Sequence, residues 1–143
     1  MFVLEISARG LYRVRFPKRY PILEPGSRMG GFPDKLLVGM KPDLSGFTKF
    51  QLRVYSTLRK VPAGTILTYG ELASRAGFPG AARAVGTAMR KNRLPIMIPC
   101  HRVLPASGGL GNYSAGNRWK LWLLNREKLH AQRATGNAQR RMP

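Results

Sequence analysis

The chain has 143 residues, of which 43% are hydrophobic and 9% aromatic, a composition typical of one folded domain rather than of a disordered chain. No apolar run is long enough to span a membrane, and the first residues lack the order of basic, apolar and small residues that marks a signal peptide. The single cysteine excludes an internal disulfide framework, and one cysteine with two histidines cannot form a cysteine-rich structural zinc site. We therefore expect a cytoplasmic protein without a bound metal or cofactor.

Positive charge is the strongest compositional signal. The chain carries 25 Lys and Arg against six Asp and Glu, a formal net charge of +19. Most of the excess lies in residues 46–130, where Glu71 and Glu127 are the only acidic residues. Such a field attracts polyanions and speeds the encounter with them. Nucleic acid is the first candidate partner and an anionic membrane surface the second, and the alternative is a basic surface that serves solubility alone.

The N-terminal residues predict a small, irregular part of the fold. Residues 1–16 alternate weakly between apolar and polar positions, which predicts a strand. Alternation would place Leu11 on one face of that strand and Val14 on the other. Residues 17–46 are rich in Pro and Gly and have no helical period, so we expect loops there, with one short element near residues 34–40.

Helical patterns begin after residue 47. Residues 48–61 repeat apolar positions at a spacing of four, with Thr48 as a candidate N-cap, and predict a helix. A second helix is predicted to begin after Thr68, because Glu71 follows three residues later and completes a capping box. This helix is expected to end at Gly77.

A further short helix is predicted from Pro79 to Asn92, and it is rich in small residues. Two short helices separated by the sequence GFPG are typical of a helix-turn-helix motif, although an ordinary pair of antiparallel helices gives the same pattern. Small side chains would let this helix lie close either to the core or to a DNA groove.

The C-terminal third begins with an apolar run over residues 94–105, bounded by prolines, which we interpret as a buried extended segment. A glycine-rich loop follows, without the lysine and spacing of a phosphate-binding loop. Residues 118–130 predict a strongly apolar helix, and residues 131–143 a basic tail that is flexible.

The sequence IPCHRV holds the single cysteine, Cys100, directly before His101. A free cysteine is most often a small buried apolar residue, and a nucleophilic one needs a nearby base or cation. Adjacent side chains on an extended backbone point in opposite directions, so adjacency alone does not make the pair a reactive site. Glu127 could orient and polarise the histidine, and a Cys-His-Glu relay is chemically sensible if the three residues meet.

Six short motifs occur in a fixed order along the chain: TYGELA, AARAVG, MRKN, IPCHRV, GNYS and WLLNRE. Together they resemble the O6-alkylguanine-DNA alkyltransferase family from about residue 47 to residue 129. The resemblance implies an α+β fold. It comprises a short β-containing N-terminal part (1–46), a mainly helical, winged helix-turn-helix-like domain for DNA binding and alkyl transfer (47–130), and the basic tail (131–143). Family members usually carry a larger N-terminal domain, and metal ligands known in some relatives have no counterpart here.

The resemblance also implies a role for each catalytic residue. Cys100 would attack the alkyl carbon of O6-alkylguanine, and His101 would take the thiol proton through a water. Glu127 would orient His101, and Tyr69 would donate to N3 of the guanine. Asn92 would brace the turn before the active-site segment.

The remaining implied roles concern the substrate and the DNA. Backbone groups of Cys100 and Val103 would accept from the exocyclic amine of guanine, and the Ser114 N–H would face O6. Arg83 would fill the gap left by the flipped nucleotide. The other residues implied in substrate binding are Tyr113, Pro95 and Met89, and those implied in contact with the minor groove are Ala81, Ala82, Ala84, Gly86 and Arg90.

The expected activity is the irreversible transfer of one alkyl group from O6-alkylguanine, with O4-alkylthymine as a further candidate, by a monomer that acts on double-stranded DNA. One alternative is a non-catalytic alkyltransferase-like protein that binds the lesion, and the presence of Cys100 argues against it. Another is a basic helix-turn-helix regulator in which Cys100 is inert, and a thiol hydrolase is more distant.

Overall fold

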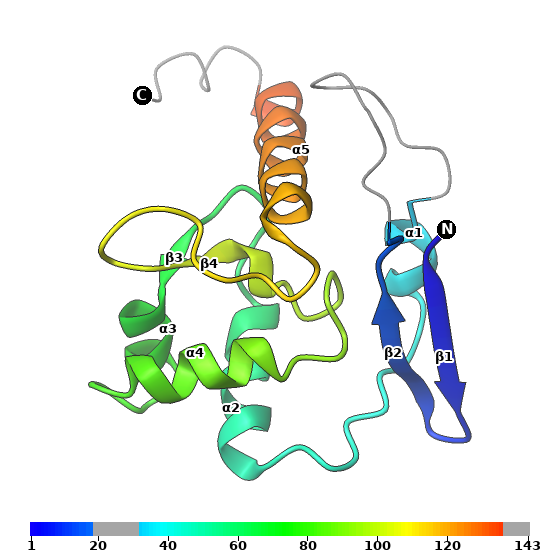
Figure 1. Cartoon of the computed structure of the whole chain (residues 1–143), viewed down its shortest axis with the longest axis horizontal. Coiled ribbons are helices and arrows are strands. Elements are labelled where there is room, and N and C mark those ends of the chain that lie inside the picture. Colours follow the sequence, from blue (N-terminus) through cyan, green and yellow to red (C-terminus); the bar gives the residue numbers. More distant parts are fainter. Residues whose placement is uncertain (19–31, 136–143) are drawn as a thin grey trace.

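The structure, a computed structural model, describes residues 1–18 and 32–135, with side chains as far as residue 128. Its helices and strands confirm the expected α+β class, with strands in the N-terminal part and mainly helices after it (Figure 1). In chain order the elements are β1 (Val3–Ser7), β2 (Gly10–Arg15), α1 (Asp34–Val38), α2 (Lys49–Arg59), β3 (Leu67–Thr68), α3 (Tyr69–Arg75), α4 (Ala82–Arg90), the 3-10 helix η1 (Cys100–Arg102), β4 (Val103–Leu104) and α5 (Asn117–Thr135).

The single strand expected near the N-terminus is an antiparallel hairpin of β1 and β2. Its register shifts between Glu5, which pairs with Arg13, and Ile6, which pairs with Leu11. The extra residue in β2 is a β-bulge, and it changes the face on which later side chains lie. As a result Leu11 and Val14 are both buried, so the prediction that they lie on opposite faces was wrong.

The hairpin packs tightly against the segment that follows α1. Gly10 has a φ of +134°, and a Cβ on it would lie 2.2 Å from the carbonyl oxygen of Lys41. Only glycine fits both this conformation and this close approach. The backbone of Leu11 then donates to Lys41 and accepts from Asp43, so the hairpin and this segment form one unit.

Arg93 joins this N-terminal unit to the helical part of the molecule. Its guanidinium donates to the carbonyl oxygens of Tyr12, Asp43 and Ser45, each at 2.8 Å. It also lies over the rings of Tyr12 and Phe47, at 4.2 and 4.0 Å from the centroids. The rigid guanidinium can donate to several carbonyls at once. This one side chain therefore links β2 and the segment after α1 to the chain that follows α4.

Two predicted helix starts are confirmed, whereas the helix predicted from Pro79 to Asn92 is shorter and spans Ala82–Arg90. Thr48 and Thr68 cap α2 and α3, each in a reciprocal capping box with the residue three positions later. The buried Tyr55 of α2 donates its hydroxyl to the Ala88 carbonyl of α4 at 2.6 Å. The helices α3 and α4, which flank the GFPG break, pack against each other, as either a helix-turn-helix motif or an ordinary helix pair would (Figure 1).

The segment over residues 94–105 is not extended as expected. Its backbone turns over residues 95–97, forms η1 and only then enters the short strand β4, which pairs in parallel with β3. The Asn92 side chain accepts from the Leu94 N–H and donates to the Ile98 carbonyl, each at 2.9 Å. These bonds satisfy backbone groups locally, so the buried chain needs no strand partner there.

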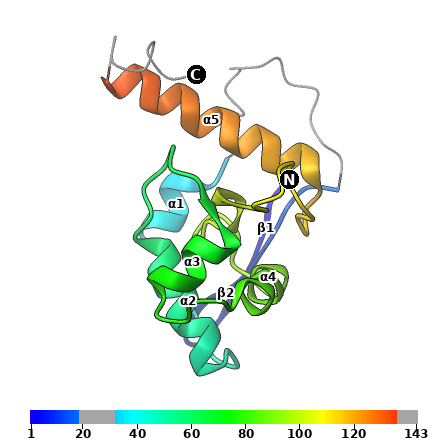
Figure 2. The same ribbon diagram turned by 90° about the vertical axis from the view of Figure 1, so that its left-hand side faces the viewer.

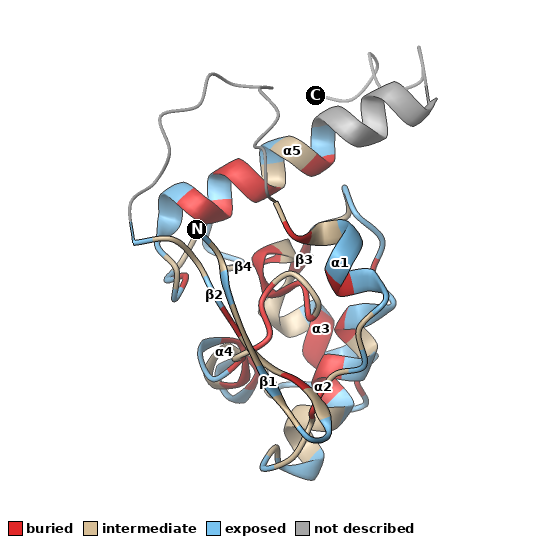
Figure 3. Ribbon diagram, turned by 90° about the vertical axis from the view of Figure 1, so that its right-hand side faces the viewer, coloured by how far each residue is buried: buried red, intermediate tan, exposed pale blue. Residues whose placement is uncertain are grey.

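Helix α5 extends to Thr135, beyond the predicted end at residue 130, and the rest of the predicted tail, residues 136–143, lies outside the described residues. Figures 1 and 2 place α5 at one end of the molecule, on the side opposite α2 and α4. Its Arg126 pairs with Asp34 of α1 and lies over the ring of Phe32. The buried positions in Figure 3 lie on the inward sides of α2 to α5. Within residues 1–18 and 32–135, no helix is long and apolar enough to cross a bilayer.

Candidate active site

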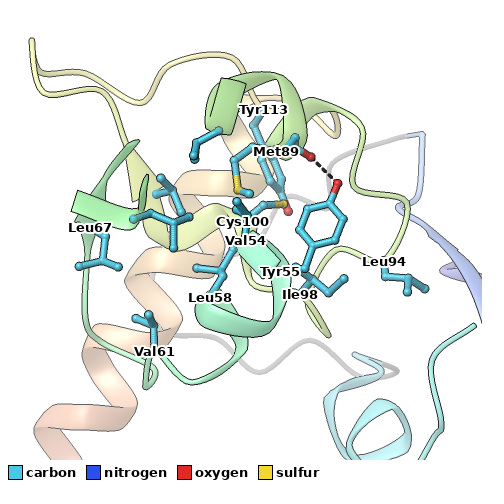
Figure 4. Packing of buried hydrophobic residues seen from close by; sticks show 14 of the residues in the cluster. Val54, Tyr55, Leu58, Val61, Leu67, Met89, Leu94, Ile98, Cys100 and Tyr113 are labelled. Atoms are coloured by element: carbon cyan, nitrogen blue, oxygen red, sulfur yellow. Dashed lines mark hydrogen bonds between the residues drawn. The ribbon is translucent and has the colours of Figure 1, made fainter. Parts of the chain in front are cut away.

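Cys100 is the first residue of η1 and lies in the hydrophobic core, with 4% of its surface exposed. Figure 4 shows its sulfur among side chains of α2, α4 and the loop before α5, with Val54, Met89 and Tyr113 nearby. Burial raises the pKa of the Cys100 thiol, because a thiolate loses its hydration there. The polar side chains of Asn92 and Tyr113 and the positive charge of Lys120 oppose this rise.

His101 and Glu127 form the buried pair expected from the sequence. The Nε2 atom of His101 lies 2.7 Å from Oε1 of Glu127, and the side chains are 2% and 9% exposed. A carboxylate can only accept, so Nε2 carries a proton, and in the neutral imidazole Nδ1 keeps a lone pair. Within the described part of the chain, this Nδ1 is one of two buried side-chain polar atoms without a hydrogen-bond partner. In its neutral form the imidazole is therefore held in the tautomer that can take up a proton at Nδ1.

Arg102 completes a cluster that the sequence analysis missed. Its Nη2 donates to Oε1 of Glu127 at 2.7 Å and its Nε to Oε2 at 3.1 Å, while Nη1 donates to the Val61 carbonyl at 2.7 Å. Burial alone would raise the pKa of Glu127, but the hydrogen bonds and charges of His101 and Arg102 lower it to about 2. The carboxylate is thus ionised at any physiological pH.

Lys120 is the second residue that the sequence analysis missed. Its side chain is fully buried, and its Nζ donates to the Val103 carbonyl at 2.8 Å. Burial lowers the pKa of Lys120, and the nearby Cys100 opposes this. Lys120 and Glu127 are seven residues apart on α5, which places them on one face of that helix. The spacing of seven residues could have predicted that Lys120 lies on the same face as Glu127. The neighbouring Trp119 and Trp122 made this helix look uniformly apolar instead.

Tyr113 and Tyr69 are both close enough to Cys100 to interact with it electrostatically. Burial and the neighbouring Cys100 raise the pKa of Tyr113 well above its ordinary value. The pKa of Tyr69 is raised by burial and then by Cys100. A Cβ on Gly111, which has a φ of +69°, would lie 3.3 Å from the Tyr69 hydroxyl. The glycine-rich loop therefore approaches the hydroxyl at the start of α3.

The other residues implied in substrate binding differ in their burial. Met89 and Pro95 are buried, and Met89 belongs to the same core cluster as Cys100. Val103 is buried with its carbonyl already bonded to Lys120, and a carbonyl has a second lone pair to offer. Ser114 is exposed.

The residues implied in DNA contact lie on α4 and just before it. Arg83 and Ala84 are exposed, and Ala81, Ala82 and Gly86 are half-buried. The opposite side of α4 carries the buried Val85, Ala88 and Met89. Arg90 is exposed, and its guanidinium donates to Thr87 of its own helix at 3.0 Å. The helix thus presents a basic face with small side chains, and it packs on the core through the other face.

Within the described residues, no group of three or more His, Cys, Asp and Glu side chains lies close enough together to hold a metal ion.

Residues 49–129 match the family described as 6-O-methylguanine DNA methyltransferase, DNA binding domain, and this match covers more than half of the chain. The chain belongs to this family. A methylated-DNA–protein-cysteine methyltransferase of Shigella flexneri is 42% identical over 107 residues, which are 68% of this chain and 63% of that protein. The chain therefore matches less than two thirds of the length of this family relative.

Solved structures extend the similarity into the N-terminal part. The crystal structure of Mycobacterium tuberculosis OGT in complex with DNA has a TM-score of 0.70 at 36% identity, over 90% of this chain and 86% of that chain. The structure of S. pombe Atl1, in complex with damaged DNA containing O6-carboxymethylguanine, has a TM-score of 0.50 at 34% identity. It covers 55% of this chain and 75% of that one. Family and fold are thus shown for the region that holds Cys100, His101, Arg102 and Glu127.

Proposed function

We propose that the chain repairs DNA directly by moving the alkyl group of O6-alkylguanine to Cys100, once per protein molecule. The observation that carries this proposal is the unpartnered Nδ1 of His101, held by Glu127 in the tautomer that can take the thiol proton. A buried cysteine that served packing alone would have no need of such a base. The relative in Shigella flexneri is named as a methylated-DNA–protein-cysteine methyltransferase, which supports the same reading.

The proposed chemistry is an in-line displacement at saturated carbon. The thiol proton of Cys100 passes through a water to Nδ1 of His101, and Glu127 stabilises the imidazolium that forms. The thiolate then forms a bond to the alkyl carbon, and the bond between that carbon and O6 breaks. Tyr69 donates to N3 as negative charge moves onto the leaving guanine, which takes up one proton overall. The products are guanine and a stable thioether, so no step regenerates the thiol.

The proposed DNA-binding mode uses the exposed face of α4 in the minor groove. Arg83 occupies the gap left by the flipped nucleotide, and the small neighbours of Arg83 let the helix approach closely. A damaged base pairs poorly, so its extrusion costs less than that of a normal base. M. tuberculosis OGT and S. pombe Atl1 were both crystallised with DNA, which supports DNA as the partner of this chain.

The proposed setting is the cytoplasm, where a reducing environment keeps the single cysteine of the chain as a thiol. One chain acts on one lesion as a monomer, and it holds the nucleophile, base and basic helix that the reaction uses.

Mass spectrometry of the protein after incubation with a duplex containing O6-methylguanine tests this function. Replacement of S–H by S–CH3 should add about 14 Da, confined to the peptide that holds Cys100. The same duplex with unmodified guanine is the control and should add nothing. Binding to the lesion without a gain in mass would instead indicate an alkyltransferase-like protein, and equal binding to both duplexes a regulator.

Glu127→Gln should slow transfer at neutral pH by about a hundredfold, the lower end of what a positioned base contributes. The amide removes the charge that supports His101, so the thiolate forms less readily. Raising the pH should restore part of the rate, because hydroxide can deprotonate Cys100 directly, and DNA affinity should not change. Single-turnover rates across pH, together with duplex binding, provide the measurement. A defect that does not depend on pH would assign Glu127 a structural role only.

A second readout of the same variant is acid stability. In the folded protein the pKa of Glu127 is about 2, below its ordinary value of 4.5. The stabilisation is therefore complete above pH 4.5 and is lost as the pH falls towards 2, a difference of about 3 kcal/mol. Glu127→Gln should lack this acid step in its free energy of unfolding.

A further inference from the structure

Glu127 is shared by two donors that compete for the same carboxylate. Its Oε1 accepts from His101 Nε2 at 2.7 Å and from Arg102 Nη2 at 2.7 Å. The Arg102 side chain is only 15% exposed, and its guanidinium also donates to the Val61 carbonyl. Arg102 therefore cannot move away without leaving both the Glu127 carboxylate and the Val61 carbonyl without this donor. The backbone N–H of Gly64 approaches Oε2 at 3.5 Å. The carboxylate is therefore held from the loop after α2, from η1 and from α5 itself.

The charges of this cluster decide the protonation of His101. With Arg102 present, a neutral His101 leaves the buried cluster uncharged, because the arginine balances the carboxylate. Protonation of His101 would then add an uncompensated buried charge, which is costly. Without Arg102, the carboxylate and an imidazolium would balance each other instead, and a carboxylate 2.7 Å away strongly favours that charged form. An imidazolium already carries a proton on Nδ1 and cannot take one from a thiol.

We propose that Arg102 is a positioning residue that balances the charge of Glu127 and thereby keeps His101 neutral and able to accept a proton. This inference rests on the proposed function, in which His101 is the base. Within the described residues, the charged and titratable groups that interact with Glu127 are His101, Arg102 and Tyr113. Tyr113 is neutral when protonated, so Arg102 supplies the positive charge in this set.

The test follows the protonation of His101 directly and without substrate. The chain has two histidines, so a His130→Gln background leaves His101 as the only imidazole, and its NMR signal can be titrated. In this background, Arg102→Met should raise the midpoint by about one pH unit or more. Arg102→Lys keeps the charge and should stay near the parent value. Arg59→Met removes an exposed arginine at the end of α2 and is the matched control for the loss of one charge.

The reaction rate should follow the same shift. With free O6-benzylguanine as substrate, the acid limb of the rate profile should move to higher pH in Arg102→Met, while the rate at high pH is retained. Arg102→Gln, which keeps donors towards Glu127 and Val61, serves if the methionine variant does not fold. A midpoint that is unchanged or lower in Arg102→Met, or a shift in Arg102→Lys as large as in Arg102→Met, would overturn the proposal. A parent protein that titrates as expected but never reacts would reject the proposed function instead.

Discussion

Cys100→Ser should abolish alkyl transfer while the protein still binds duplex DNA that contains O6-methylguanine. A serine hydroxyl is far less acidic and less nucleophilic than a thiol, so the His101–Glu127 pair cannot convert it into a comparable nucleophile. The substitution is also nearly isosteric, and the buried site around residue 100 should keep its packing. The expected result is therefore a loss of chemistry without a loss of fold.

The stoichiometry of the parent protein provides the companion measurement. Cys100 is the only thiol in the chain, and its thioether product is a poor leaving group. With a large excess of methylated duplex, the amount of guanine restored should level off at one per protein molecule. Residual transfer by Cys100→Ser, or several turnovers by the parent protein, would contradict the assignment of Cys100 as an irreversible acceptor.

Arg83→Ala should slow the repair of duplex DNA by about tenfold or more, while the reaction with free O6-benzylguanine keeps its rate. Arg83 is exposed on α4, whereas Cys100, His101 and Glu127 are buried, so the substitution should leave the chemistry unchanged. Extrusion of a base costs a few kcal/mol, and a side chain that fills the vacated stack offsets part of this cost. A free base needs no extrusion, so the contrast between the two substrates isolates that step.

Arg90→Ala is the matched control on the same helix. Arg90 is exposed as well, but its guanidinium bonds to Thr87 rather than projecting freely. If Arg90 contacts a phosphate, Arg90→Ala should weaken binding equally for duplexes with and without the lesion, and the slope of affinity against salt should fall by about one. Equal losses on both substrates in Arg83→Ala would reject the role in the stack and indicate a folding defect.

Features that depend on neighbours in sequence were predictable from the sequence. The capping boxes at Thr48 and Thr68 join residues three positions apart, and both are present as predicted. The break between α3 and α4 follows from Gly and Pro, whose backbone preferences are intrinsic. Cys100 and His101 are adjacent in the chain, so their shared location needed no fold to predict. Family membership rested on the order of such local motifs.

The β-bulge in β2 and the turn before Cys100 were not predictable in this way. The weak alternation in residues 1–16 holds for a regular strand, but the packing of Leu11 and Val14 into one core selects a bulged one. The apolar run before Cys100 is compatible with either an extended or a turned buried backbone. The turn is selected by the Asn92 side chain, which bonds to the backbone of Leu94 and Ile98.

The sequence by itself determined the capped starts of α2 and α3, the break between α3 and α4, and the choice of Cys100 and His101 as the proposed nucleophile and base. Only the tertiary structure decided which charges surround them. Glu127 lies 26 residues from His101 and 25 from Arg102, and the approach of α5 to η1 brings the three together. The same approach buries Lys120 against Val103. Local hydrogen bonds and backbone preferences depend on nearby residues and are encoded in short motifs, whereas the pairing of distant charges depends on how the helices pack.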